Sequence, residues 1–118
     1  MRLAADPETA RWVDRMVGRP QDFDWDAGNR TKNRKHRVEA EDVEALFHRT
    51  IVLAGRLVEP AHEELRWLLL GQNEAGRRLA LVFTRRGAKL RAISCRSMRR
   101  NERRLYEEAI TAQEAPRE

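Results

Sequence analysis

The sequence predicts a single α+β domain in which a small antiparallel sheet packs against helices. The chain has 118 residues, a length that suits one domain. Three apolar segments at 66–71, 79–84 and 89–95 follow one another through short turns, and such turns join antiparallel neighbours. The helical patterns lie before and after these segments, whereas a parallel sheet would have helices alternating with its strands.

The first expected element is a helix near the N-terminus. Asp6 can cap it, and Trp12 and Met16 are spaced by four residues on one side of it. Gly18 follows as a stop signal. We therefore expect residues 1–20 to form an N-terminal extension helix that docks through Trp12.

The main domain is expected to span residues 21–110. Residues 22–25 resemble a short edge strand, and residues 26–37 a polar helix. An amphipathic helix is expected at 41–48, followed by a β-branched run at 50–53 that favours a further strand.

The second half of the chain gives the clearest pattern, a three-strand meander. Turns at 73–76 and 85–87 separate its strands. Ser97 can cap a last helix, and a polar tail is expected over residues 111–118.

Charge is the most informative part of the composition. The 24 Lys and Arg residues exceed the 19 acidic residues and give a net charge of +5. From Arg77 to Arg104 there are 11 basic residues and one acidic residue. From Arg30 to Arg37 there are five basic residues and no acidic residue. Clusters of this kind are typical of proteins that bind nucleic acid, although a solvated basic face is the plain alternative.

Several classes of protein are excluded. No apolar run approaches the roughly 20 residues of a membrane helix. One cysteine, Cys95, excludes an internal disulfide, and we expect it to be a buried core thiol. The histidines His36, His48 and His62 lack metal-binding spacing. We expect a cytoplasmic protein with no cofactor, no metal and no membrane association.

An ordered set of short motifs then carries a resemblance to a known family. The set begins with Phe-Asp-Trp-Asp at 23–26 and continues through segments at 32–36, 43–47, 66–71, 76–84, 91–96 and 102–107. Together these segments resemble the BrnT toxin family over about residues 22–108. Arg37 stands where that family usually has glycine, which predicts a changed turn after His36.

The resemblance implies a RelE-like fold and a function in a type II toxin–antitoxin pair. It implies an endoribonuclease toxin that cleaves RNA and inhibits translation. A BrnA-like antitoxin with a ribbon-helix-helix part would silence it, in a 2:2 complex that binds operator DNA through the antitoxin.

Metal-free RNA cleavage requires proton transfer and stabilisation of the charged transition state, and basic side chains can supply both. We expect Lys35 or His36 to transfer protons, and Arg66, Arg85 and Arg96 to stabilise the phosphate. Glu102 and Tyr106 are supporting candidates. The side chains expected to bind RNA are Lys32, Arg91, Arg99 and Arg100.

Two alternatives remain open from the sequence. The same basic patch suits a nucleic-acid-binding domain without catalysis, or a structural partner that docks an acidic protein. A substitution at His36 would separate them, because an enzyme would lose rate and keep affinity.

Overall fold

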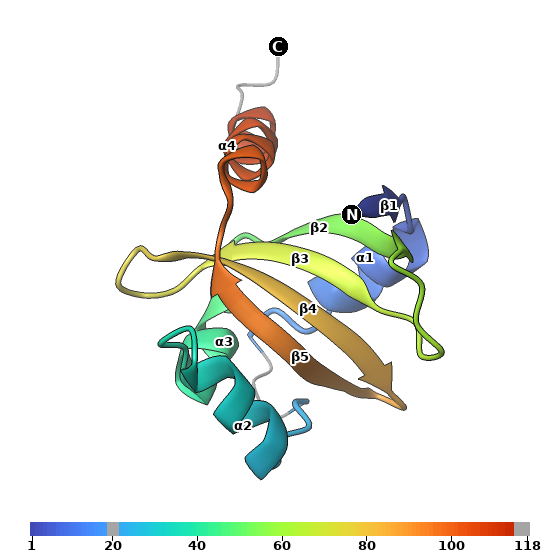
Figure 1. Ribbon diagram of the computed structural model, residues 1–118. Helices are drawn as coiled ribbons and strands as arrows, with labels where there is room; N and C mark the ends of the chain where they lie inside the picture. Colours follow the sequence, from blue (N-terminus) through green and yellow to red (C-terminus); the bar gives the residue numbers. More distant parts are fainter. Residues whose placement is uncertain (19–21, 115–118) are drawn as a thin grey trace.

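A computed structural model describes residues 1–18 and 22–114 of the chain (Figure 1). The described residues form a five-stranded antiparallel sheet with strand order β1-β2-β3-β4-β5, together with four helices. The predicted α+β class with an antiparallel sheet is confirmed. In chain order the elements are β1 (Arg2–Ala4), α1 (Pro7–Asp14), α2 (Ala27–Arg34), α3 (Ala40–Leu46), β2 (Val52–Glu59), β3 (Trp67–Gln72), β4 (Arg78–Arg86), β5 (Lys89–Ser97) and α4 (Arg100–Glu114).

The three-strand meander forms as predicted by β3, β4 and β5. Asn73 organises the first turn, since its side chain accepts a hydrogen bond from the Arg77 N–H at 2.8 Å. Gly76 and Gly87 supply the positive φ angles of the two turns, 85° and 63°, which side chains disfavour. Local turn chemistry therefore determines this part of the sheet.

The sheet differs from the prediction at its other edge. β2 runs to Glu59, well beyond the predicted strand at 50–53, and β1 pairs with it as a fifth strand. Gly55 lies at a β-bulge with φ 151°, and a Cβ atom there would lie 2.7 Å from the Ala4 carbonyl oxygen. The close approach of β1 therefore requires glycine at this position.

The segment at 22–25, predicted as an edge strand, makes only one β-bridge, between Phe23 and Leu90. Ser97, predicted to cap the last helix, lies in β5, and α4 begins at Arg100. α4 also continues to Glu114, into the stretch predicted as a tail, while residues 115–118 lie outside the described residues.

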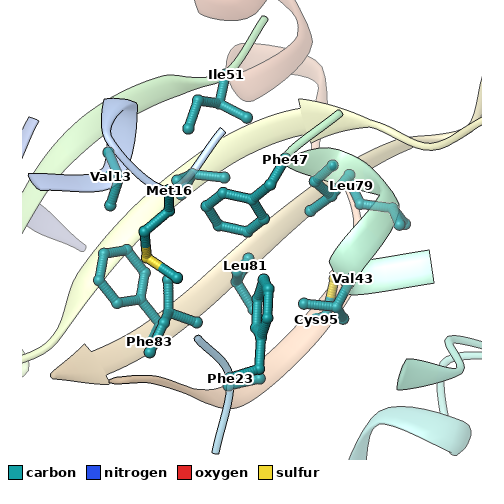
Figure 2. Packing of buried hydrophobic residues seen from close by; sticks show 14 of the residues in the cluster. Val13, Met16, Phe23, Val43, Phe47, Ile51, Leu79, Leu81, Phe83 and Cys95 are labelled. Carbon is teal, nitrogen blue, oxygen red and sulfur yellow. The ribbon is translucent and has the colours of Figure 1, made fainter. Parts of the chain in front are cut away.

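One face of the sheet carries the main hydrophobic core. α1, α2 and α3 lie on this side (Figure 1), and we call it the covered face. Figure 2 shows Met16 and Phe47 converging on Leu81 and Phe83 of β4. The rings of Trp12 and Trp67 both stack on Phe83, with centroid distances of 6.3 and 5.6 Å.

The predicted N-terminal helix exists and docks through Trp12. Asp6 caps it by accepting a hydrogen bond from the Thr9 N–H, and Asp6 also accepts one from the Trp67 indole N–H at 2.8 Å. Residues 1–18 thus share the sheet and core of the main domain through β1 and α1. Residues 19–20 of the predicted extension lie outside the described residues.

α2 is almost wholly polar, as predicted, and buried amides hold it at the edge of β5. The Asn29 side chain donates to the Ala92 carbonyl oxygen at 3.2 Å, and the Asn33 side chain accepts from the Cys95 N–H at 2.9 Å. These bonds satisfy backbone groups that an edge strand would otherwise leave unpaired. Two side chains therefore replace a neighbouring strand.

Candidate functional site

The strand register assigns the basic side chains to the two faces of the sheet. Trp67 pairs with Phe83 and both belong to the main core on the covered face. Side chains alternate along a strand, so Arg66, one residue before Trp67, lies on the opposite face. We call this opposite face the α4 face, because Tyr106 of α4 packs on it. Met98, from the loop before α4, packs on the same face.

Arg96 lies on the α4 face, since it pairs with Ala80, whose side chain belongs to the second cluster. Arg66, the residue before Trp67, is level with Thr84, the residue after Phe83. Thr84 lies four residues beyond Ala80 along β4. About 13 Å therefore separate Arg66 and Arg96 along the strand direction, at roughly 3.3 Å per residue. The two arginines lie at opposite ends of one face.

At the Arg96 end, the guanidinium is paired with a carboxylate. It donates to both carboxylate oxygens of Glu102, at 2.7 and 3.0 Å, and the Arg99 N–H donates to the same carboxylate at 2.8 Å. The Glu102 side chain is only 7% exposed. Burial alone would raise the pKa of Glu102, but the hydrogen bonds from Arg96 and Arg99 and their charges hold it below its ordinary value.

Tyr106 packs beside this pair and is 2% exposed. Its hydroxyl donates to the Thr50 carbonyl oxygen at 3.3 Å, and the Arg78 guanidinium lies 5.7 Å from the centre of its ring. Burial raises the pKa of the Tyr106 hydroxyl. Glu102 and Tyr106 thus join α4 to the sheet.

At the Arg66 end, the guanidinium is not engaged in the same way. Its Nε atom is buried and has no hydrogen-bond partner among the residues that the structure describes. Arg66 lines a hollow of about 140 Å³ together with Arg56, His62 and Glu64. An arginine that lines a hollow and keeps an unsatisfied donor is suited to binding an anionic oxygen.

The loop from β2 to β3 forms one wall of this hollow and is held by side chains of β4. Arg86 donates to both Glu64 carboxylate oxygens at 2.7 and 3.3 Å, and the Thr84 hydroxyl donates to the Leu65 carbonyl oxygen at 2.7 Å. The hydrogen bond from Arg86 is the main cause that lowers the pKa of Glu64. Glu64 is therefore ionised and already paired with Arg86.

Arg91 lies at the same level of the sheet as Arg66, because it pairs with Thr84, the residue after Phe83. Its guanidinium lies 2.8 Å from an Asp26 carboxylate oxygen and 3.7 Å from one of Asp24. Arg91 and Lys32 line a second hollow of about 190 Å³ between β5 and α2. Two of the predicted RNA-binding residues therefore lie beside one another.

Lys35 and His36 are exposed after the end of α2, at the opposite end of β5. Arg77 fixes this turn by donating to the carbonyl oxygens of His36 and Arg37, at 2.8 and 2.7 Å, and it also donates to the Ser97 hydroxyl. Ser97 is six residues from Arg91 along β5, about 20 Å.

The turn after His36 was predicted to change because Arg37 replaces glycine. Arg37 instead adopts φ 58°, the left-handed conformation that glycine favours. The turn keeps a glycine-type backbone and carries an arginine in it.

Arg85 lies on the covered face, where its guanidinium stacks 4.4 Å from the centre of the Trp12 ring. It is therefore separated from Arg66 and Arg96 by the sheet itself. Arg99 and Arg100 are exposed at the start of α4, close in sequence to the Arg96–Glu102 pair. The predicted catalytic residues thus occupy four places on the molecule: the turn after α2, the two ends of the α4 face, and the covered face.

Other titratable groups are less suited to RNA. A hollow of about 430 Å³ beside α3 is lined by Glu41, Asp42, Glu44 and Glu74, so it repels phosphate. Cys95 is buried as predicted, and burial raises the pKa of its thiol to about 12. Among residues 1–18 and 22–114, no three His, Cys, Asp or Glu side chains are grouped to hold a metal ion.

His62 was not singled out in the sequence as a site residue. It lies in an irregular loop and belongs to no recognisable motif, so only its position four residues before Arg66 could have drawn attention to it. The folded loop brings it to the same hollow as that arginine.

Comparison with protein families favours the ribonuclease among the open alternatives. Residues 25–102 match the family described as "Ribonuclease toxin, BrnT, of type II toxin-antitoxin system". The chain belongs to the BrnT family. The match confirms the resemblance seen in the sequence and covers the structure from Trp25 to Glu102. A comparison with curated proteins finds no match.

As a BrnT protein, the chain is a ribonuclease toxin of a type II toxin–antitoxin system, with RNA as substrate and an antitoxin as partner. No helix in the part of the chain that the structure describes is long and apolar enough to cross a membrane. β1, α1 and most of α4 lie outside the matched residues.

Proposed function

We propose that this BrnT toxin is a metal-independent endoribonuclease that cleaves RNA at the Arg66 end of the α4 face and thereby inhibits translation in the cytoplasm. The observation that carries the proposal is that Arg66 lines a hollow while its buried Nε has no partner among the residues described. Arg91 and Lys32 continue the basic surface toward β5 and α2.

The chemistry requires activation of a 2′-hydroxyl, stabilisation of the charged phosphorus centre and departure of the 5′-oxygen. A guanidinium is suited to the second task because it is always charged and donates in a planar fork. Arg66 would supply it directly. Arg96 would bind a neighbouring phosphate only when its bonds to Glu102 are exchanged, so its proposed role is secondary.

Lys35, His36 and Arg85 stay predictions as catalytic groups. Their positions favour other tasks, because the first two lie after the end of α2 and Arg85 stacks on Trp12. Arg99 and Arg100 are exposed and suited to binding the RNA backbone beyond the reacting phosphate.

Cleavage of RNA by the purified protein in EDTA tests the chemical part of the proposal. We expect cleavage to persist, and we expect RNA affinity to fall steeply with salt because several phosphates are neutralised. A strict requirement for an added divalent metal would defeat metal independence. Binding without any cleavage would favour the non-catalytic alternative.

For the partner, we propose a BrnA-like antitoxin that covers the α4 face in a 2:2 complex. The ribbon-helix-helix part of the antitoxin would bind operator DNA. The segment from Arg77 to Arg104, with 11 basic residues against one acid, supports an acidic covering segment. Arg66→Glu should weaken antitoxin binding, whereas Arg85→Glu on the covered face is the matched control. Equal affinities for the two variants and the wild type would contradict a shared surface.

A further inference from the structure

We propose that His62 is a catalytic residue of this toxin and accepts the proton of the attacking 2′-hydroxyl. The inference rests on the proposed ribonuclease function and deepens it, because it assigns a proton-transfer group to the Arg66 end. The hollow beside the β2–β3 loop would then hold the reacting phosphodiester.

The positions of the three histidines in the chain favour this assignment. His36 follows α2, where Arg77 binds its carbonyl oxygen at the Ser97 end of the sheet. His48 follows α3 and its Nδ1 lies 3.5 Å from a Glu74 carboxylate oxygen, in the acidic hollow. His62 alone among the three lines a hollow together with Arg66.

The charged groups around His62 suit a phosphodiester rather than a neutral ligand. Arg66, the residue before β3, lines the hollow with it, and Glu64 supplies the one carboxylate among the lining residues. Glu64 is bound by Arg86 of β4, and Arg66 and Arg91 also lower the pKa of Glu64. The carboxylate is thus neutralised by its neighbours, and the surplus positive charge is available to RNA.

The loop that carries His62 is anchored on both sides. The Leu57 N–H donates to the Arg66 carbonyl oxygen at 2.8 Å, which continues the β2–β3 pairing to the base of the loop. The Thr84 hydroxyl and the Arg86 guanidinium bind Leu65 and Glu64 from β4. These bonds fix the loop on β4 while His62 stays exposed at the hollow that Arg66 also lines, as a group that contacts substrate requires.

The proposed step balances in protons and charge. Neutral His62 takes the proton of the 2′-hydroxyl while the 2′-oxygen forms a bond to phosphorus, and Arg66 stabilises the added negative charge. The bond from phosphorus to the 5′-oxygen breaks, and that oxygen takes a proton from water. The imidazolium then gives its proton to the resulting hydroxide, which leaves a 2′,3′-cyclic phosphate and a 5′-hydroxyl.

The test compares three purified variants of the full chain, His62→Gln, His36→Gln and His48→Gln. Each removes one histidine from an exposed position, so all three should fold, and their thermal unfolding is measured to verify this. Single-turnover cleavage is measured from pH 5 to 9. Affinity is measured separately with an RNA carrying 2′-deoxyribose at the cleavage site, which binds but has no nucleophile.

We expect His62→Gln to lower the cleavage rate about 10²- to 10⁴-fold, the usual contribution of a general base. Its affinity for the 2′-deoxy RNA should stay within about threefold of the wild type. The dependence of the rate on pH should also change in this variant, because the general base is lost. His48→Gln should match the wild type in both measurements.

A wild-type rate for His62→Gln would overturn the assignment. So would a loss of rate that occurs in His36→Gln but not in His62→Gln, because proton transfer would then take place beside α2. These results leave the ribonuclease function intact. Failure of the wild-type protein to cleave RNA would instead contradict the proposed function itself.

Discussion

The two ends of the α4 face carry arginines of the same type in opposite situations. At one end, Arg96 is bound to Glu102 through two hydrogen bonds, and the carboxylate also accepts from the first turn of α4. At the other end, Arg66 has a buried Nε with no partner in the described part of the chain, and it borders a hollow that His62 also lines.

The difference separates a structural arginine from a binding arginine. A buried guanidinium with a satisfied carboxylate stabilises the junction between sheet and helix, and removing either partner leaves an uncompensated charge. A guanidinium that folding leaves unsatisfied gains its partner from a ligand. We therefore interpret the Arg96 end as the support of α4 and the Arg66 end as the place of the chemistry.

The largest expected effect is on catalysis at the Arg66 end. Arg66→Ala should lower the rate of RNA cleavage about 10²- to 10³-fold, the usual loss when one group that stabilises transition-state charge is removed. Its free energy of unfolding should change little, because no partner is left uncompensated. Arg104→Ala removes the same charge from an exposed position on α4 and is the matched control. Similar rates for the two variants would refute the special role of Arg66.

The second expected effect is on the stability of the protein at the Arg96 end, where the arginine is paired with Glu102. Glu102→Gln should lower the free energy of unfolding by about 2–3 kcal/mol, somewhat less than for a fully buried ion pair because Arg96 is 19% exposed. Urea unfolding measures this change. An unchanged midpoint would mean that the pair does not hold α4.

The pH dependence of stability sharpens the same comparison. The pKa of Glu102 is lower in the folded protein than its ordinary value of 4.5, so its contribution is complete above that pH. It is lost as the pH falls through the lower folded-state pKa. The difference in unfolding free energy between wild type and Glu102→Gln should thus be constant above about pH 5.5, one unit above that value, and shrink in acid. A difference that grows in acid would contradict the assignment.

The smallest expected effect is at the turn that carries Lys35 and His36. Arg37→Gly removes a side chain from a residue with φ 58° and should raise the free energy of unfolding by about 0.5–1 kcal/mol. Thermal unfolding measures the gain. RNA cleavage should keep its wild-type rate, since this turn is distant from Arg66. A large loss of rate would move the chemistry toward α2.

The meander could be predicted from the sequence because its determinants are local. Asn73, Gly76 and Gly87 determine the turns, and the apolar runs between them determine the strands. β1 could not be predicted, since three residues pair with a strand more than 50 residues away. The end of β2 was missed because the bulge at Gly55 interrupts the alternation of side chains.

The candidate site was predictable in composition but not in arrangement. Charge clustering identified the arginines, yet Arg66 and Arg85 lie on opposite faces, and the sequence does not say which face packs on α1. The buried pair of Arg96 and Glu102 was visible only as two nearby charges. His62 had no signal apart from its closeness to Arg66, because its role depends on how a loop folds.

The most direct measurement is the footprint of bound RNA on the side chains themselves. Nuclear magnetic resonance of the Arg Nε–H and His ring signals is recorded with and without the 2′-deoxy RNA. We expect large shifts at Arg66 and His62, smaller ones at Arg91, and none at Arg85 or His36. Shifts confined to His36 and its neighbours after α2, with Arg66 unchanged, would contradict cleavage at the Arg66 end of the α4 face.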